Sequence, residues 1–167
     1  MTKKTGWLLS ASLAGLGIMF FASRRWNGGI ELKKFEIPQD LDQYLSQSES
    51  EIPHITPQTE KTITWANPAK TRTALAVVYL HGYSATRQET APLANEIAAQ
   101  LGANLFCTRL CGHGLSGEAL AQATVNDWLN DAMEAVEIGK RLGDKVIVMG
   151  VSTGGRLPAR LRDLDRR

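Results

Sequence analysis

A serine flanked by glycines stands in the segment Gly150-Val151-Ser152-Thr153-Gly154, directly after an apolar run. A serine hydroxyl can attack a carbonyl carbon when it projects from a tight turn that leads from a strand into a helix. Glycines on both sides let the backbone approach itself there without a Cβ clash. The following helix would point N–H groups at the negative charge that develops on the carbonyl oxygen. The pattern therefore predicts that Ser152 is a nucleophile.

A second motif, His81-Gly82-Tyr83, follows the apolar run that ends at Leu80. The order of the two motifs resembles that of an α/β-hydrolase, in which the loop after such a strand supplies another backbone N–H to the same oxyanion. We expect the N–H groups of Tyr83 and Thr153 to form this oxyanion hole, with His81 and Gly82 as structural residues of the loop. A glycine-serine motif alone arises by chance in loops. Two motifs in this order, each at the end of a predicted strand, are far more specific.

The elements between the motifs must bring them to one edge of a sheet. Strands are predicted at residues 62–65, 74–80, 103–108 and 145–149, and helices at 90–101 and from 125 to the glycine at 143. The run Ala74 to Leu80 is apolar throughout, as in a strand buried on both faces. Thr124 and Asp127 have the spacing of a capping box for the second helix. Alternating strands and helices predict an α/β fold with a mostly parallel sheet and helices on both faces.

The stretch from Thr62 to Gly155 resembles the α/β-hydrolase superfamily, in particular its carboxylesterase and monoacylglycerol-lipase-like branch. The resemblance rests on both motifs, on Gly112-His113-Gly114-Leu115-Ser116, and on Asp127-Trp128. It implies the N-terminal half of an α/β-hydrolase sheet and a serine hydrolase that needs no cofactor. Its substrate would be a small-molecule or lipid-like carboxylic ester. In the implied mechanism Ser152 attacks the acyl carbonyl, and a histidine held by an acid takes its proton.

The sequence departs from this family after Ser152. The acid and the histidine should follow the serine, yet residues 153–167 contain no histidine. The three histidines fall in the predicted linker (His54), the oxyanion loop (His81) and a loop with a structural family role (His113). Asp163 and Asp165 fall where the helix after the turn belongs. We therefore expect the chain as given to be inactive.

The last twelve residues, 156–167, are unusual for a helix that should pack on a sheet. They hold five Arg and two Asp, a local net charge of +3, so this segment supplies the positive balance of the chain. A frameshift or an early stop just past Gly155 would explain both this composition and the missing partners. The strand at 145–149 would then form a bare apolar edge, so we expect a marginally stable or insoluble chain.

The N-terminus has the pattern of a membrane-directed segment. Lys3 and Lys4 precede an apolar run from Trp7 to Ala22, and Arg24 and Arg25 close it. We expect residues 1–26 to form an apolar helix that is an uncleaved membrane anchor. Export followed by signal cleavage, and a soluble protein with an apolar N-terminal helix, are the alternatives. Residues 27–60 are polar and contain three prolines, which indicates a linker. Residues 61–155 then form the hydrolase half, and 156–167 an Arg-rich tail.

Composition narrows the remaining classes. A net charge of +2 argues against a nucleic-acid partner. Cys107 and Cys111, even with His113, supply too few ligands for a metal site. Two alternatives to an esterase stay open. One is a non-catalytic, membrane-anchored α/β domain that binds a ligand or partner. The other is a nucleotide-binding βαβ unit, although the G-x-G-x-x-G spacing is absent.

Overall fold

A computed structural model describes residues 29–165 of the chain; residues 1–28 and 166–167 lie outside it. The predicted membrane anchor, residues 1–26, therefore falls outside the described residues. Between residues 29 and 165, no helix is long and apolar enough to cross a membrane. The described residues from Leu32 onward form one compact unit, which we call the second unit, and it contains the whole sheet.

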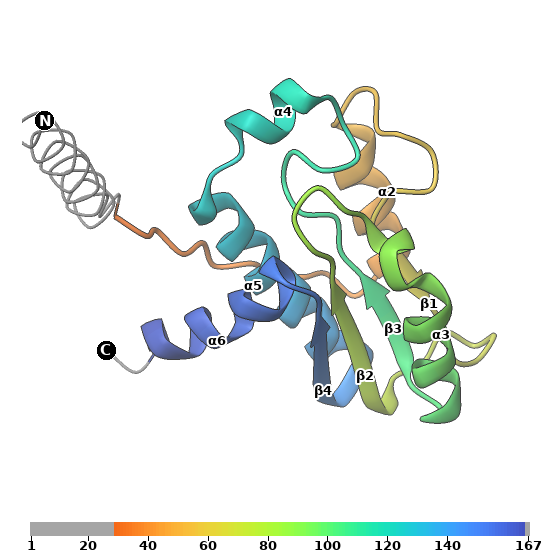
Figure 1. Ribbon diagram of the computed structural model, residues 1–167. Helices are drawn as coiled ribbons and strands as arrows, with labels where there is room; N and C mark the ends of the chain where they lie inside the picture. Colours follow the sequence, from red (N-terminus) through yellow and green to blue (C-terminus); the bar gives the residue numbers. More distant parts are fainter. Residues whose placement is uncertain (1–28, 166–167) are drawn as a thin grey trace, which may run out of the picture. The chain divides into compact units, whose positions relative to one another are not determined.

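Strands and helices alternate along the second unit (Figure 1). In chain order the elements are α2 (Leu41–Ser50), β1 (Thr62–Thr64), β2 (Thr73–Leu80), the 3-10 helix η1 (Arg87–Thr90), α3 (Ala91–Gln100), β3 (Asn104–Cys107), α4 (Gly117–Gln122), α5 (Val125–Leu142), β4 (Gly143–Gly150) and α6 (Thr153–Asp165). The strands form one sheet in the order β1-β3-β2-β4. β2 runs parallel to β3 and β4, and β1 is antiparallel to β3. The predicted α/β class with a mostly parallel sheet is confirmed.

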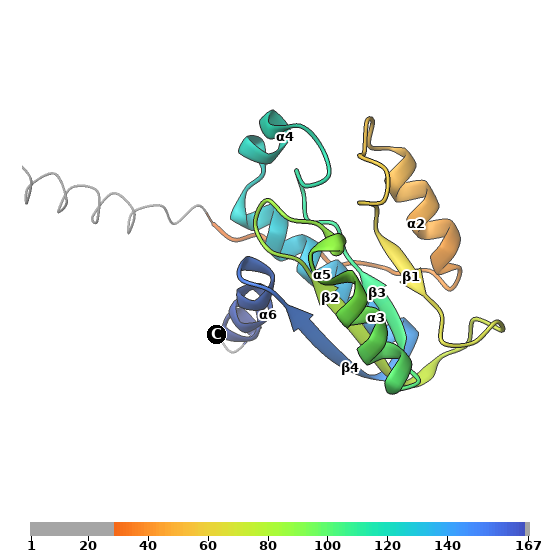
Figure 2. The ribbon, with the colours of Figure 1, turned by 45° about the vertical axis from the view of Figure 1, so that its right-hand side comes forward.

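The central strand β2 is buried on both faces, as its apolar run predicts. Because side chains alternate along a strand, Val77 and Tyr79 pack with α3 in one cluster of buried residues. Val78 points the other way, toward α5. A Cβ atom placed on Gly139 of α5 would lie only 2.6 Å from a methyl carbon of Val78. Figures 1 and 2 accordingly show α3 and α5 on opposite faces of the sheet.

Helix α5 begins and ends where the sequence predicts. The Thr124 hydroxyl accepts a hydrogen bond from the Asp127 N–H, and the Asp127 carboxylate accepts one from the Thr124 N–H at 2.9 Å. This is a complete capping box. Val125, at the start of the helix, is 52% exposed. The buried face is formed by Leu129, Ala132, Ala135 and Ile138.

The segment predicted as a linker, residues 27–60, contains a helix within the described part of the chain. From Leu32 onward this segment belongs to the same compact unit as the sheet. Asp40 caps α2, which buries Leu41 and Leu45. Glu49, near the end of α2, forms an ion pair with Arg109 beyond β3. The segment looked like a linker because its polar residues cover an outer face or form ion pairs, while only a few apolar residues reach the core.

The Arg-rich segment forms a helix, which its composition argued against. In α6 the side chains of Leu157 and Leu161 are buried, one helical turn apart. Arg156, Arg160 and Arg162 are exposed. Few leucines suffice because a helix needs only one apolar stripe to pack. Strand β4, which precedes α6, pairs only with β2 among residues 29–165. β4 is therefore an edge strand of the described sheet, and its Ile147 side chain is 38% exposed.

Candidate active site

The predicted nucleophile lies on a tight turn between β4 and α6. β4 ends at Gly150 and α6 begins at Thr153, so only Val151 and Ser152 connect them. Ser152 is exposed and has φ of +48°, in the left-handed region. This conformation costs a residue with a Cβ atom about 1–2 kcal/mol. The turn thus has the strained strand-to-helix geometry that the motif requires, while the nucleophilic role of Ser152 stays a prediction.

The turn packs directly against the end of β2. The Val151 N–H donates a hydrogen bond to the Leu80 carbonyl oxygen at 3.1 Å. A Cβ atom on Gly154 would lie 2.5 Å from the His81 carbonyl oxygen and closer still to that of Leu80. A Cβ atom on Gly150 would lie 2.5 Å from the Gly154 carbonyl carbon. The glycines of the motif therefore permit the backbone contact that brings Ser152 beside the second motif.

Residues 81–84 form the loop that carries the second motif, which we call the oxyanion loop. The Gly82 N–H donates to the Glu89 carboxylate at 3.0 Å. Tyr83 is 56% exposed. Within residues 29–165, the N–H groups of Tyr83 and Thr153 donate no hydrogen bond to another residue. Neither N–H group is therefore engaged by another residue of the described part of the chain. Glu89 anchors this loop from the 3-10 helix seven residues away, and no motif or periodic pattern in the sequence points to it.

Two buried histidines hold the loops around this site. His81 Nε2 accepts a hydrogen bond from the Leu110 N–H at 3.1 Å, and His81 Nδ1 lies 2.9 Å from the Gly82 carbonyl oxygen. His113 Nε2 accepts from the Ser84 N–H at 3.1 Å, and its Nδ1 lies 3.1 Å from the Cys111 carbonyl oxygen. An Nε2 acceptor requires each neutral ring to carry its proton on Nδ1. Neither ring keeps a free lone pair with which to take a proton from Ser152.

Burial keeps both imidazoles neutral. Loss of hydration lowers the pKa of His81 to about 4 and also lowers the pKa of His113. The rings meet edge to face, with centroids 4.8 Å apart. Tyr83 and Trp128 complete an aromatic cluster around His113, with centroids 6.1 and 5.8 Å from it. Trp128 also donates from its indole nitrogen to the Cys111 carbonyl oxygen at 3.0 Å. The oxyanion loop, the loop after β3 and α5 are thus connected beside Ser152.

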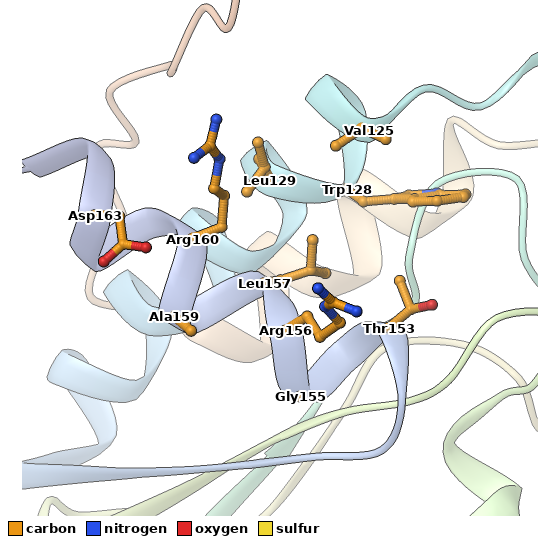
Figure 3. A pocket seen from close by; sticks show the side chains of 10 residues that line it. All are labelled: Val125, Trp128, Leu129, Thr153, Gly155, Arg156, Leu157, Ala159, Arg160 and Asp163. Atoms are coloured by element: carbon orange, nitrogen blue, oxygen red, sulfur yellow. The ribbon is translucent and has the colours of Figure 1, made fainter. Parts of the chain in front are cut away.

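A cavity of about 630 Å³ opens between α5 and α6. Figure 3 shows its lining, with Leu157 pointing between the two helices and Thr153, the neighbour of Ser152, at one end. The apolar lining residues are Val125, Trp128, Leu129, Leu157 and Ala159. The polar ones are Thr153, Arg156, Arg160 and Asp163. A largely apolar cavity beside the predicted nucleophile can hold an acyl chain. Asp163 lies on α6, where the sequence placed it.

The described residues give no metal centre. Between residues 29 and 165, no three His, Cys, Asp or Glu side chains are placed to hold an ion together. Cys107 is a buried free thiol and Cys111 an exposed one. Burial raises the pKa of the Cys107 thiol to about 11, which makes it unreactive near neutral pH.

The strain at Ser152 can be tested by substitution. We expect Ser152→Gly to raise the free energy of unfolding by about 1 kcal/mol relative to Ser152→Ala, because glycine adopts the left-handed conformation without a Cβ penalty. Both variants remove the hydroxyl, so alanine is the matched control. Urea denaturation followed by tryptophan fluorescence measures the difference. Equal stability of the two variants would show that residue 152 is not strained.

The described chain thus combines a mostly parallel α/β sheet with an exposed serine on a strained strand-to-helix turn at one end of that sheet. No family model matches the chain. A thermostable monoacylglycerol lipase from Bacillus sp. (strain H-257) is 32% identical over 83 residues, which are 50% of this chain and 33% of the lipase.

A solved structure from work on LipS and LipT, two metagenome-derived lipolytic enzymes, is similar to this chain with a TM-score of 0.54 and 26% sequence identity. The match covers 62% of this chain and 39% of that one. This chain is therefore a distant homologue, over part of its length, of members of the α/β-hydrolase superfamily. It spans about a third of the lipase and about two fifths of the solved chain.

Proposed function

We propose that this chain carries the nucleophile and the oxyanion hole of a serine hydrolase that cleaves carboxylic esters. The observation that carries the proposal is Ser152 itself, exposed and in the left-handed conformation on the turn between β4 and α6. The unpaired N–H groups of Tyr83 and Thr153 support it, because two such donors stabilise the oxyanion of a tetrahedral intermediate. In this reaction the Ser152 Oγ adds to the acyl carbonyl carbon and the alcohol leaves.

Lipid-like esters are the substrate class that we propose. The homologous monoacylglycerol lipase and the apolar cavity between α5 and α6 both support an acyl chain next to Thr153. The N-terminal run Trp7 to Ala22, flanked by basic residues, supports attachment to a membrane, where such esters are found. Export followed by signal cleavage is the alternative location. The proposed chemistry requires no cofactor.

The nucleophile can be identified by covalent labelling of the full-length chain. We expect a fluorophosphonate to modify Ser152 slowly but selectively over the other serines of the chain. In serine hydrolases that have lost triad members, the oxyanion hole and binding alone retain a rate enhancement of about 10³–10⁴-fold over water. We expect the same donors to favour attack by Ser152 over attack by the other serines. Peptide mass spectrometry locates the adduct, with Ser152→Ala and Ser116→Ala as paired variants. Labelling that is spread over several exposed serines, or that persists in Ser152→Ala, would contradict the proposal.

Steady-state turnover by the chain as given should be near background. His81 and His113 both use Nε2 as an acceptor for a backbone N–H, so neither can serve as the general base. Loss of the base from a catalytic triad costs about 10⁶-fold in kcat. We expect p-nitrophenyl butyrate hydrolysis to be equal for the native chain and Ser152→Ala. A turnover that depends on Ser152 would show that another group of this chain takes the proton.

The same histidine bonds favour a second candidate, a non-catalytic α/β domain that binds a lipid-like ligand. Its discriminating measurement is binding of 1-monolaurin by isothermal titration calorimetry, together with the labelling experiment. Saturable binding without any adduct at Ser152 would favour this candidate over the esterase.

A further inference from the structure

The loop after β3, residues 108–116, determines where the oxyanion loop lies. We call it the β3 loop. Two hydrogen bonds connect the loops, from the Leu110 N–H to His81 Nε2 and from the Ser84 N–H to His113 Nε2, both at 3.1 Å. Ser84 directly follows Tyr83. A shift of His113 would therefore move the peptide unit next to the Tyr83 N–H.

The β3 loop is held in turn by the segment that precedes β1. Arg109 binds Glu49 of α2 through two hydrogen bonds, Nε to Oε2 at 3.0 Å and Nη2 to Oε1 at 2.9 Å. The same guanidinium donates from Nη1 to the His113 carbonyl oxygen at 3.3 Å. Farther along, the Thr56 N–H donates to the Gly114 carbonyl oxygen at 2.7 Å. The segment thus holds the β3 loop on both sides of His113.

The Glu49–Arg109 pair is buried, which makes its geometry specific. The side chains are 10% and 3% exposed. Burial pushes the pKa of Glu49 up, but the hydrogen bonds and charge of Arg109 outweigh it, so the net pKa lies below its ordinary value. Glu49 is therefore ionised near neutral pH. A bidentate carboxylate fixes the plane of the guanidinium, and so the direction of its remaining donor toward His113.

We propose that Glu49 and Arg109 are positioning residues for the oxyanion hole. They act through His113 and Ser84 on the Tyr83 N–H. Glu49 and Arg109 are themselves 60 residues apart in the sequence. Helix α2 then belongs to the support of the active site. This positioning role rests on the proposed function, because it assumes that the Tyr83 N–H binds the oxyanion. The structural coupling between the Glu49–Arg109 pair and the oxyanion loop can be measured without any reaction.

Amide hydrogen exchange of the full-length chain tests this connection. In Glu49→Gln we expect the Ser84 and Leu110 amides to exchange about tenfold faster or more, with the Val78 amide of β2 unchanged, since local opening is detected separately from global unfolding. Arg109→Lys keeps the charge but loses the bidentate geometry, so it should also accelerate exchange of the Ser84 and Leu110 amides. This second variant allows the test to be made if Glu49→Gln does not fold.

The matched control is Glu134→Gln. Glu134 is about as buried as Glu49, accepts from Lys61 Nζ at 2.6 Å and from the Tyr44 hydroxyl at 2.7 Å, and so also connects α2 to the body. None of these contacts involves a residue of the β3 loop, although the Lys61 backbone N–H also donates to Glu49 Oε2 at 3.0 Å. We expect Ser84 exchange in this variant to stay within about twofold of native. An unchanged Ser84 rate in both Glu49→Gln and Arg109→Lys, or equal acceleration in Glu134→Gln, would overturn the inference.

The labelling rate at Ser152 adds the functional measurement. Fluorophosphonate modification should slow severalfold in Glu49→Gln relative to Glu134→Gln, because the oxyanion donor is displaced. Equal labelling rates in these two variants would overturn the positioning role even if exchange at Ser84 changes. An absence of Ser152 labelling in the native chain would instead reject the proposed function, while the Ser84 exchange rates would still decide whether the loops are coupled.

Discussion

Replacing Gly154 by alanine is expected to lower the free energy of unfolding by about 3 kcal/mol, because the added methyl group has no space. It would meet the His81 carbonyl oxygen at 2.5 Å and the Leu80 carbonyl oxygen closer still. Both oxygens belong to backbone that is fixed by the buried end of β2. The Leu80 oxygen cannot move without breaking the bond that it accepts from the Val151 N–H. Urea denaturation of the full-length chain measures the loss.

Gly117→Ala is the matched control for this change. Gly117 is the first residue of α4, and a Cβ atom there would meet nothing within 4 Å. We expect its effect on the free energy of unfolding to stay within about 0.5 kcal/mol. If both variants were equally stable, the turn at Ser152 would not approach the end of β2, and the two motifs would not form one site.

The parts of this fold that the sequence predicts are those that depend on local chemistry. The run Ala74 to Leu80 predicts a buried strand because every side chain on both faces is apolar. Thr124 and Asp127 predict the start of α5 because a capping box needs only two residues three apart. The glycines around Ser152 predict the turn because only a missing Cβ allows the close approach that the structure shows.

The parts that the sequence does not predict depend on contacts between distant residues. Glu49 and Arg109 are 60 residues apart, and nothing near either residue signals that they will pair. Without that pair α2 is a polar segment, which is why residues 27–60 resembled a linker. The Arg-rich helix α6 was misjudged for a related reason. Its composition is polar, but Leu157 and Leu161 lie on one stripe, and the position of a residue on the helix decides its burial.

The candidate site divides in the same way. Its residues that contribute backbone geometry, Ser152, Gly154 and the Gly82 turn, follow from short motifs. The side chains that hold those residues do not. Glu89 accepts a hydrogen bond from the Gly82 N–H, and it lies on a 3-10 helix that no periodic pattern in the sequence predicts. The tautomers of His81 and His113 depend on N–H donors 29 residues away in the chain.

Acidification should reveal the buried neutral state of His81. Its pKa is about 4 in the folded chain and about 6.5 when unfolded, so between these values the unfolded chain binds the extra proton. The neutral ring therefore contributes stability that is fully present above pH 6.5 and is lost as the pH falls toward 4. A difference of about 2.5 pKa units corresponds to about 3 kcal/mol. His113 shifts in the same direction, also through burial.

Other groups titrate in this range, so the contribution of His81 must be isolated. Burial raises the pKa of Asp131 to about 6, which makes acid favour the folded state at that residue and opposes His81. A variant that lacks only the imidazole retains Asp131 and every other group. We expect the difference in unfolding free energy between the native chain and His81→Asn to narrow by about 3 kcal/mol from pH 7 to pH 4.

His54→Asn controls for the loss of a histidine as such. His54 is exposed and has φ of +62°, a conformation that asparagine tolerates well, so the exchange introduces no backbone strain. Any pH dependence that His54→Asn shares with His81→Asn reflects the loss of a histidine as such, and only the excess in His81→Asn is assigned to the buried ring. If the His81→Asn difference showed no such excess, the imidazole would not be held neutral. The hydrogen bond from Leu110 to its Nε2, and with it one of the two connections between the β3 loop and the oxyanion loop, would then have to be rejected.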